Sequence, residues 1–507
     1  MNKIKYLSLI ATAALTLSFS ACGSRKSIEN TSNFASDGTQ LDSALKKEDT
    51  ESSYEDVNSE EYISISENKM ISTETENTVS LSLKVDTASY SNVQRMLKNN
   101  MLPPKDAVRT EEFINYFKYE ERASKTNSPF SIYSEIGRSP FSDNKHMAFL
   151  RVLTDEIEAE KLPPSNITFL IDTSGSMESH DKLPLLKSAF GLLTETLTEN
   201  DMVSIVTYAG SSRVALDSVS GSEKNKILSA INDLTSGGST GGEEGINRAY
   251  SLAAANFKKD GNNRVILATD GDFNVGISSV SELEKFISKK KDSGIYLSIL
   301  GFGTGNLKDN TMETLSKHGN GNYSYIGSLE TAKKVLVTEM GANLYTVAND
   351  VKAQVEFNPE YVKNYRLIGY ENRVMNNEEF DNDKKDAGEI GAGCDVIVMF
   401  ELELTDKNVD EKSELFKLNV RYKDPKEQES KLFFEIISGG KLSNKNSKDF
   451  NFACSAAAFG AKLRNPDSNI DIFDILNLAK NNIGTDKEGY RNDFLEMIKN
   501  FIKIESD

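Results

Sequence analysis

Three stretches of the sequence carry oxygen-bearing side chains that together have the chemistry of a metal site. The segment DTSGS spans residues 172–176 and ends a strongly apolar run. Thr240 lies in a glycine-rich segment, residues 237–246, and Asp270 follows the apolar run RVILAT. Carboxylate and hydroxyl oxygens are the ligands that small, hard divalent cations such as Mg²⁺ prefer. The residue types therefore indicate a cation site built only from oxygen atoms.

The spacing within the first stretch supports this interpretation. Asp172, Ser174 and Ser176 are two residues apart, so an extended or turning backbone can direct all three to one side. Gly175 lets the chain turn there without a Cβ clash. A polar turn network that holds no metal is the alternative interpretation of the same residues.

The elements that must position these side chains alternate between strand and helix over residues 165–345. Apolar strands are expected at NITFLIDT, MVSIVTYA, NRVILATDG and IYLSILGFG. A stripe of leucine and phenylalanine at helical spacing predicts a helix over residues 183–197. Such alternation predicts a doubly wound, mainly parallel sheet with helices on both faces. In such sheets ligands bind beyond the carboxyl ends of the strands, where Asp172 and Asp270 lie.

These three stretches and the alternation around them resemble the von Willebrand factor A domain, which has a Rossmann-like fold. In that family, a metal-ion-dependent adhesion site holds Mg²⁺ or Mn²⁺ between oxygen ligands on three loops. The resemblance implies a domain over residues 165–347. The ligands that it implies are Asp172, Ser174, Ser176, Thr240 and Asp270.

The chain on either side of this domain predicts a second fold. Residues 129–160 and 348–440 contain strand patterns in series without intervening helices, which are typical of an antiparallel β-sandwich. We expect one sandwich built from both segments, with residues 165–347 inserted between them. A strand-helix segment over residues 80–128 and helices over residues 447–505 complete the predicted α/β architecture.

Both flanks resemble those of the YfbK-type bacterial lipoproteins that carry this domain. The matching text includes VDTASYSNVQRMLKNNMLPPKDAVRTEEFINYF before the domain, and YRLIGYENR and GYRNDFLEMIK after it. The resemblance covers nearly all of residues 81–502. It implies the architecture of the flanks but no biochemical activity for them.

The first residues have the pattern of a bacterial export signal. Lys3 and Lys5 precede a short apolar run, and SFSAC ends in small residues before Cys22. This pattern predicts a signal peptide over residues 1–22 and resembles a lipobox, in which Cys22 carries the lipid. An ordinary signal peptide is the alternative. Residues 23–79 are polar and poor in hydrophobes, which predicts a disordered tether. The protein is thus expected outside the cytoplasm, anchored to a bacterial membrane.

The composition argues against several other functions. The 507-residue chain has a formal net charge of −18, which disfavours a nucleic-acid partner because phosphate binding needs clustered Lys and Arg. None of its three histidines pairs at zinc-ligand spacing, and no Walker-type loop or G-x-S-x-G elbow occurs. The segment DNDKKDAGEIG lacks the EF-hand positions, which favours a polar hairpin. Cys394 and Cys454 are expected to be unpaired thiols, and a disulfide between them, which is permitted outside the cytoplasm, is the alternative.

The sequence therefore predicts a surface-exposed bacterial lipoprotein that binds a protein ligand through a divalent cation, Mg²⁺ or Mn²⁺. Five protein groups leave one octahedral position that a carboxylate of the partner can fill. The alternative is a cell-envelope scaffold in which the cation only steadies the loops. A metal-dependent hydrolase is less favoured, since His180 is the one candidate base near the predicted metal. The chain is therefore not expected to be an enzyme.

Overall fold

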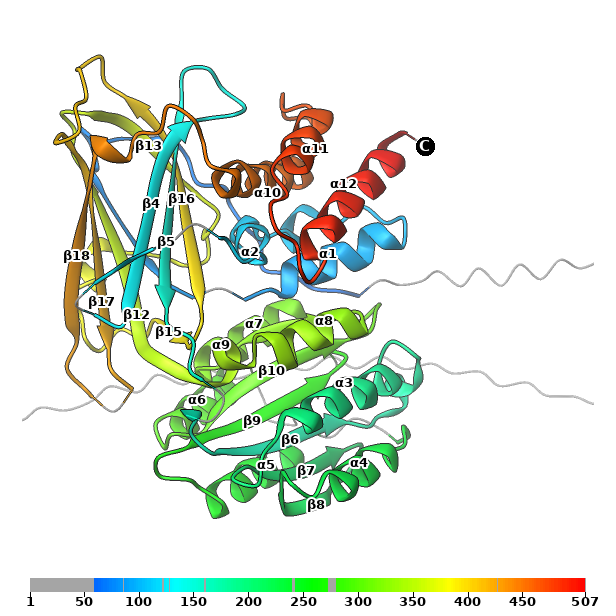
Figure 1. Ribbon diagram of the computed structural model, residues 1–507. Helices are drawn as coiled ribbons and strands as arrows, with labels where there is room; N and C mark the ends of the chain where they lie inside the picture. Colours follow the sequence, from blue (N-terminus) through cyan, green and yellow to red (C-terminus); the bar gives the residue numbers. More distant parts are fainter. Residues whose placement is uncertain are drawn as a thin grey trace, which may run out of the picture. The chain divides into compact units, whose positions relative to one another are not determined.

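The computed structural model describes residues 59–506 except 85, 121–122, 127, 159–160, 239–241, 272–279 and 426 (Figure 1). These described residues belong to one unit of the chain, residues 56–507. Cys22, the predicted signal peptide and Thr240 lie outside the described residues. No helix in the described part of the chain is long and apolar enough to cross a membrane.

A six-stranded sheet forms the centre of the inserted domain, residues 165–347 (Figure 1). The strand order is β11-β10-β9-β6-β7-β8, and every neighbouring pair is parallel except β7 and β8. The expected apolar runs form β6 (Ser165–Asp172), β7 (Met202–Tyr208), β9 (Asn262–Thr269) and β10 (Tyr296–Phe302). Two edge strands, which the sequence pattern does not predict, are β8 (Ser212–Ser220) and β11 (Tyr323–Ile326). The predicted doubly wound, mainly parallel sheet is confirmed.

Helices cover both faces of this sheet because alternate residues of each buried strand point to opposite sides. From β6, Phe169 faces one side, where its ring stacks on Phe190 with a centroid distance of 4.3 Å, and Leu170 faces the other. The first face carries α3 (Leu183–Thr196), α4 (Lys224–Asn232), α8 (Leu329–Lys333), the π-helix η4 (Lys334–Thr338) and α9 (Met340–Leu344). The second face carries α5 (Gly242–Ala255), α6 (Val280–Lys291) and α7 (Asp309–His318).

The flanking segments form an antiparallel sandwich of two sheets. One sheet has the order β1-β13-β16-β5-β4-β3, and the other has the order β14-β2-β12-β17-β18, with β15 paired to β12. Strand β5 pairs along its length with β16, so strands that precede and follow the inserted domain share one sheet. This pairing confirms that the domain is inserted in a flanking sandwich.

The strands of the first sheet are β1 (Ile71–Ser72), β3 (Ser124–Lys125), β4 (Phe130–Arg138), β5 (His146–Thr154), β13 (Val362–Ile368) and β16 (Asp395–Leu404). Those of the second are β2 (Thr78–Ser82), β12 (Thr346–Phe357), β14 (Val374–Met375), β15 (Gly388–Gly391), β17 (Glu414–Lys423) and β18 (Lys431–Ser438). Their inward-facing residues form one apolar core.

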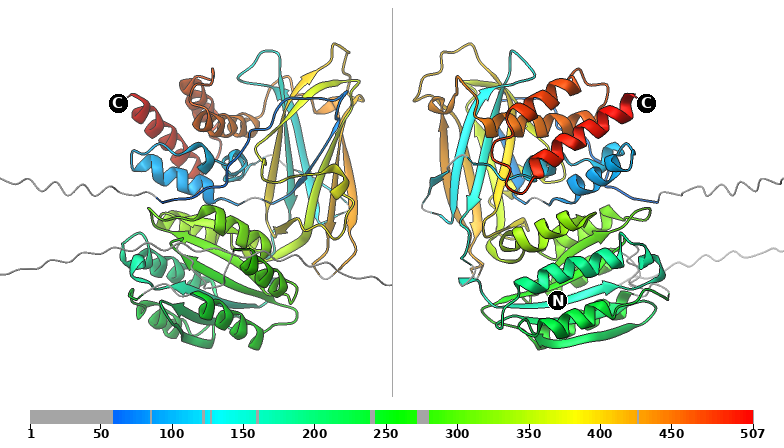
Figure 2. Two further views of the ribbon diagram at one scale, coloured as in Figure 1. Left: turned by 180° about the vertical axis from the view of Figure 1, so that it is seen from behind. Right: turned by 45° about the vertical axis from the view of Figure 1, so that its right-hand side comes forward.

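A layer of helices packs on the outer face of the β5–β16 pair. Phe149 and Met399 face the helices, whereas Ala148 and Phe400 face the sandwich core. The helices come from both flanks (Figure 2): α1 (Ala88–Lys98), α2 (Thr110–Asn115), α10 (Lys448–Arg464), α11 (Ile472–Asn481) and α12 (Tyr490–Ser506). Cys454 lies buried in α10 and, like Cys394, is a free thiol.

The prediction of a disordered tether over residues 23–79 is wrong for its last part. Residues 71–72 form β1, which pairs with β13, and residues 78–82 form β2, which pairs with β12. Further upstream, Glu60 forms an ion pair with Arg95. These polar residues gain order from backbone hydrogen bonds to sheets and loops that other segments build. Composition alone does not reveal such partners.

Candidate metal centre

The carboxylate of Asp172 ends β6 at the carboxyl edge of the sheet in the inserted domain and is fully buried. The backbone N–H of Ser174 donates to Asp172 Oδ1 at 2.8 Å, and the Tyr208 hydroxyl donates to Oδ2 at 3.0 Å. The Thr269 hydroxyl also donates to Oδ2, at 3.4 Å. Because Tyr208 ends β7 and Thr269 ends β9, the central strands jointly fix the orientation of this carboxylate.

The two predicted serines follow Asp172 where the chain leaves the sheet. Their hydroxyl oxygens are 2.9 Å apart, with Ser174 buried and Ser176 exposed. A short 3₁₀ turn, η3 (Gly175–Glu178), then leads the chain away. One hydroxyl thus lies by the buried carboxylate and the other lies at the boundary with solvent.

The glycine-rich segment lies against the same loop. The Gly175 N–H donates to the Gly238 carbonyl at 3.2 Å, and the Gly237 N–H donates to the Thr173 carbonyl at 2.8 Å. The structure therefore brings the first two predicted segments together. Thr240 follows two residues after Gly238 but lies outside the described residues, so its role as a ligand stays a prediction.

Asp270 directly follows β9 and is also fully buried. Burial is the main reason that the pKa of Asp172 rises to about 6, and the negative charge of Asp270 adds to this rise. The hydrogen bonds from Ser174 and Tyr208 act in the opposite direction. Two neighbouring buried carboxylates cost free energy unless a cation compensates them. The site therefore stabilises a positive charge.

A lysine that the sequence motifs do not identify already compensates part of this negative charge. Lys182 Nζ donates to Asp270 Oδ2 at 2.8 Å, and the two side chains are 9% and 0% exposed. Lys182 lies immediately before α3, and its aliphatic chain packs over Gly303, where a Cβ would lie 2.2 Å from Lys182 Cε. In the sequence it is an ordinary lysine in front of an apolar helix, which gives no signal of burial.

The side chains fit a small divalent cation. Two carboxylates and two hydroxyls form an oxygen-only donor set, which Mg²⁺ and Mn²⁺ prefer. The exposure of Ser176 keeps this donor set within reach of solvent. His180 is exposed and lines a cleft formed with α1. The arrangement suits cation binding better than acid–base chemistry.

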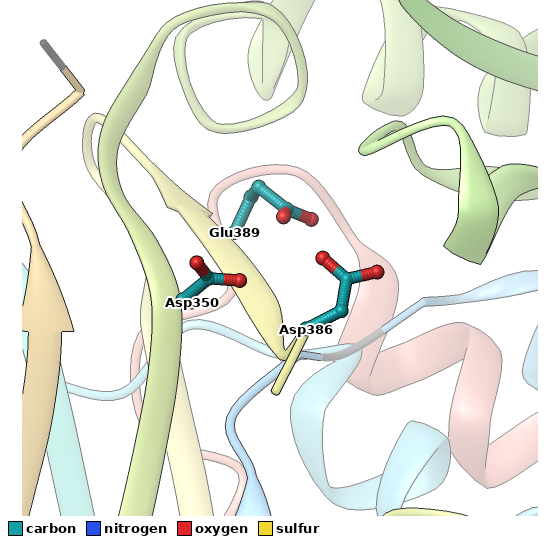
Figure 3. A group of neighbouring side chains, drawn as sticks. All are labelled: Asp350, Asp386 and Glu389. Atoms are coloured by element: carbon teal, nitrogen blue, oxygen red, sulfur yellow. The ribbon is translucent and has the colours of Figure 1, made fainter. Parts of the chain in front are cut away.

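A second group of carboxylates lies beside the paired strands β12 and β15 (Figure 3). Carboxylate oxygens of Asp350, Asp386 and Glu389 lie within 4.8 Å of one another. Lys423 Nζ donates to Asp350 at 2.7 Å, and Lys291 Nζ donates to Asp386 at 2.8 Å. Burial raises the pKa of Glu389 to about 8, so this carboxyl group is mainly protonated at neutral pH. Two ammonium groups and a proton compensate the three carboxylates, which makes this group an ion-pair network.

Models of known protein families match three parts of the chain. Residues 166–337 match the von Willebrand factor type A domain, and residues 56–148 match a family described as von Willebrand factor. Residues 342–504 match a family described as uncharacterized protein YfbK, C-terminal. The matches cover the inserted domain and both of its flanks.

Comparisons with individual proteins find the following similarities. The uncharacterized protein YfbK of Escherichia coli (strain K12) is 43% identical over 444 residues, 82% of this chain and 77% of that protein. Inter-alpha-trypsin inhibitor heavy chain H3 of Homo sapiens is 26% identical over 166 residues, 31% of this chain and 18% of that protein. A solved von Willebrand factor type A structure from Catenulispora acidiphila covers 75% of this chain and 92% of its own, with 15% identity and a TM-score of 0.42.

Proposed function

This chain belongs to the YfbK family of proteins with a von Willebrand factor type A domain, and from this premise we propose that it binds a partner protein through a divalent cation. The observation that carries the proposal is the pair of buried carboxylates, Asp172 and Asp270, close to the exposed hydroxyl of Ser176. Buried charge of this kind favours a cation, and the exposed side lets a second molecule reach it.

The residues of the site have distinct tasks in this proposal. Asp172 and Asp270 supply negative charge, and the hydroxyls of Ser174 and Ser176 supply further oxygen ligands, with Thr240 as a predicted fifth. Mg²⁺ or Mn²⁺, when bound, supplies a positive charge that attracts a carboxylate of the partner. The donors to Asp172 fix its orientation beforehand, so binding requires little reorganisation.

The proposal places this site outside the cytoplasm. The predicted signal peptide and Cys22 support export and a lipid anchor in a bacterial membrane. Because the described fold begins at residue 59, the tether in this proposal comprises residues 23–58.

A scaffold whose cation only steadies the loops is the second candidate. One observation weighs against it: the first two loops already hold each other through backbone bonds from Gly175 to Gly238 and from Gly237 to Thr173. A cation is therefore not needed to join them. The proposal also favours binding over catalysis. Neither of the relatives named above has the name of an enzyme, and His180, the one candidate base, is exposed.

The test uses the purified full chain, the variant Asp172→Ala and a control in the same loop, Asp181→Ala. Calorimetry should detect Mg²⁺ binding to the wild type and to the control but not to Asp172→Ala. Capture of a partner from an envelope extract should require Mg²⁺, and EDTA and Asp172→Ala should cause equal, non-additive losses. If the wild type binds Mg²⁺ but neither EDTA nor Asp172→Ala reduces capture of the partner, the scaffold function is correct.

A further inference from the structure

We infer that Lys182 determines which kind of group the proposed site accepts: its buried ammonium leaves the cation-loaded site with a net positive charge, which selects a carboxylate over a neutral ligand. This inference rests on the proposed function, because it concerns the coordination position that the partner fills. Lys182 lies outside the predicted ligand set and controls the choice of ligand at that position.

The Lys182 ammonium lies where its charge acts on a bound cation. Its Nζ is 2.8 Å from Asp270 Oδ2, and the side chains of the pair are 9% and 0% exposed. Salt screens such a buried pair far less than it screens exposed pairs. A cation that shares Asp270 therefore lies within the field of this ammonium.

The fold prevents Lys182 from moving away from the site. Its backbone N–H donates to the Ser179 carbonyl at 3.0 Å, and its carbonyl accepts from the Leu186 N–H at 2.8 Å. The aliphatic chain packs against Gly303, whose φ of 75° and missing Cβ make room for it. The Tyr325 hydroxyl donates to the Gly303 carbonyl at 2.9 Å and holds that loop in turn. The ammonium is thus a fixed part of the site.

The charges at the site explain the selection. The carboxylates of Asp172 and Asp270 carry two negative charges, which a divalent cation alone would cancel. Lys182 adds one positive charge, so these three buried side chains and a divalent cation together carry one net positive charge. Two ion pairs near this edge compensate themselves: Arg95 with Glu60 and Lys308 with Glu61. A carboxylate neutralises the remaining charge, whereas a hydroxyl or a water molecule leaves it in place.

Removal of this ammonium has two opposite consequences. The cation binds more tightly, because the positive charge that repels it is gone. The loaded site binds an anion more weakly, because its net charge falls to zero. A lysine that only positioned Asp270 would give a different result, since its loss would weaken cation binding. The direction of the first effect therefore separates the two roles.

The experiment compares the full-length wild type with Lys182→Met and Lys182→Arg. Lys187→Met is the matched control, because Lys187 lies in the adjoining helix α3 and donates to the Asn232 carbonyl instead. Electron paramagnetic resonance of free Mn²⁺ measures cation affinity. Fluorine relaxation of trifluoroacetate, added at equal Mn²⁺ loading, reports whether a small carboxylate reaches the bound cation. Melting curves establish that each variant is folded.

We expect Lys182→Met to bind Mn²⁺ about tenfold more tightly than the wild type and to reduce the saturable relaxation of trifluoroacetate several-fold. Lys182→Arg and Lys187→Met should behave as the wild type does. Unchanged or weaker Mn²⁺ binding by folded Lys182→Met overturns the inference, as does unchanged relaxation of trifluoroacetate. If the Met variant does not fold, the same two measurements on the polar variant Lys182→Gln test the inference, with the same expected and contradicting results.

Trifluoroacetate relaxation by the wild type separates the role of Lys182 from the function of the site. If the Mn²⁺-loaded wild type itself does not relax trifluoroacetate, no carboxylate reaches the cation and the proposed function is wrong. If the wild type relaxes it and Lys182→Met does so equally, only the role of Lys182 is wrong.

Discussion

Replacing Asp172 by Asn should stabilise the metal-free protein at neutral pH and abolish its response to Mg²⁺. The folded state raises the pKa of Asp172 from 3.8 to about 6, chiefly through burial. A group whose pKa is raised by folding contributes its full stability below the unfolded pKa and loses it as pH rises through the folded pKa. The metal-free wild type should therefore lose stability as pH rises from 3.8 to about 6. The uncharged Asp172→Asn variant should lack this loss.

The magnitude follows from the same shift. A rise of about two pKa units corresponds to about 3 kcal/mol of the free energy of unfolding at pH 7. The amide still accepts from the Ser174 N–H, but its NH₂ group faces the Tyr208 hydroxyl, which must then act as acceptor. Allowing for this weaker geometry, we expect a net gain of about 2 kcal/mol in EDTA. Mg²⁺ at 100 times its Kd adds about 2.7 kcal/mol to the wild type alone.

Thermal unfolding of the full chain at pH 7.5, in EDTA and in saturating Mg²⁺, measures both effects. The variant should melt above the wild type in EDTA, and Mg²⁺ should raise the melting temperature of the wild type only. Asp181→Asn in the same loop is the control and should follow the wild type in both buffers. A variant that melts below the wild type in EDTA refutes the reasoning, and so does an equal response of both proteins to Mg²⁺.

Three other changes have defined outcomes. In the wild type, stability present below pH 4.5 is lost as pH rises through the Glu389 pKa of about 8, so the free energy of unfolding should fall by about 2 kcal/mol between pH 6 and pH 9. Glu389→Gln should not show this fall. Equal denaturant midpoints for the wild type at both pH values would argue against it. Phe190→Ala should cost about 3–5 kcal/mol in chemical unfolding, since it empties the space against Phe169, and a cost below about 1 kcal/mol would contradict the stacked packing. Cys22→Ser should abolish labelling by a fatty-acid probe, and normal labelling would exclude Cys22 as the attachment point.

The elements that the sequence predicts well are those whose own residues carry the signal. Every residue of β6 and β9 is buried, and their apolar runs identify them without knowledge of the neighbours. Strands β1, β3 and β14 have two residues each, and their pairing depends on the strands beside them. The same dependence explains why the sequence predicts residues 59–79 as tether: strands β1 and β2 pair with β13 and β12, which lie hundreds of residues away in the chain.

The residues of the candidate site also differ in whether their own sequence signal identifies them. Asp172, Ser174, Ser176 and Asp270 are identified by residue type and by their position at strand ends, and the structure places them at one edge of the sheet. Lys182 carries no such signal, because its burial arises from Asp270, which lies 88 residues further along the chain. The ion pair with Asp270 and the packing of the loop at Gly303 against Lys182 show that this lysine belongs to the site.

An anomalous difference map from crystals of the full chain grown with Mn²⁺ would show directly whether a cation binds at the carboxyl edge of the sheet. We expect a peak between the carboxylates of Asp172 and Asp270, with an exchangeable ligand on the exposed side of Ser176. Lys182 should remain paired with Asp270 beside this peak. A map with no peak there at saturating Mn²⁺, or with its main peak at the carboxylates around Glu389, would contradict cation binding at Asp172 and Asp270.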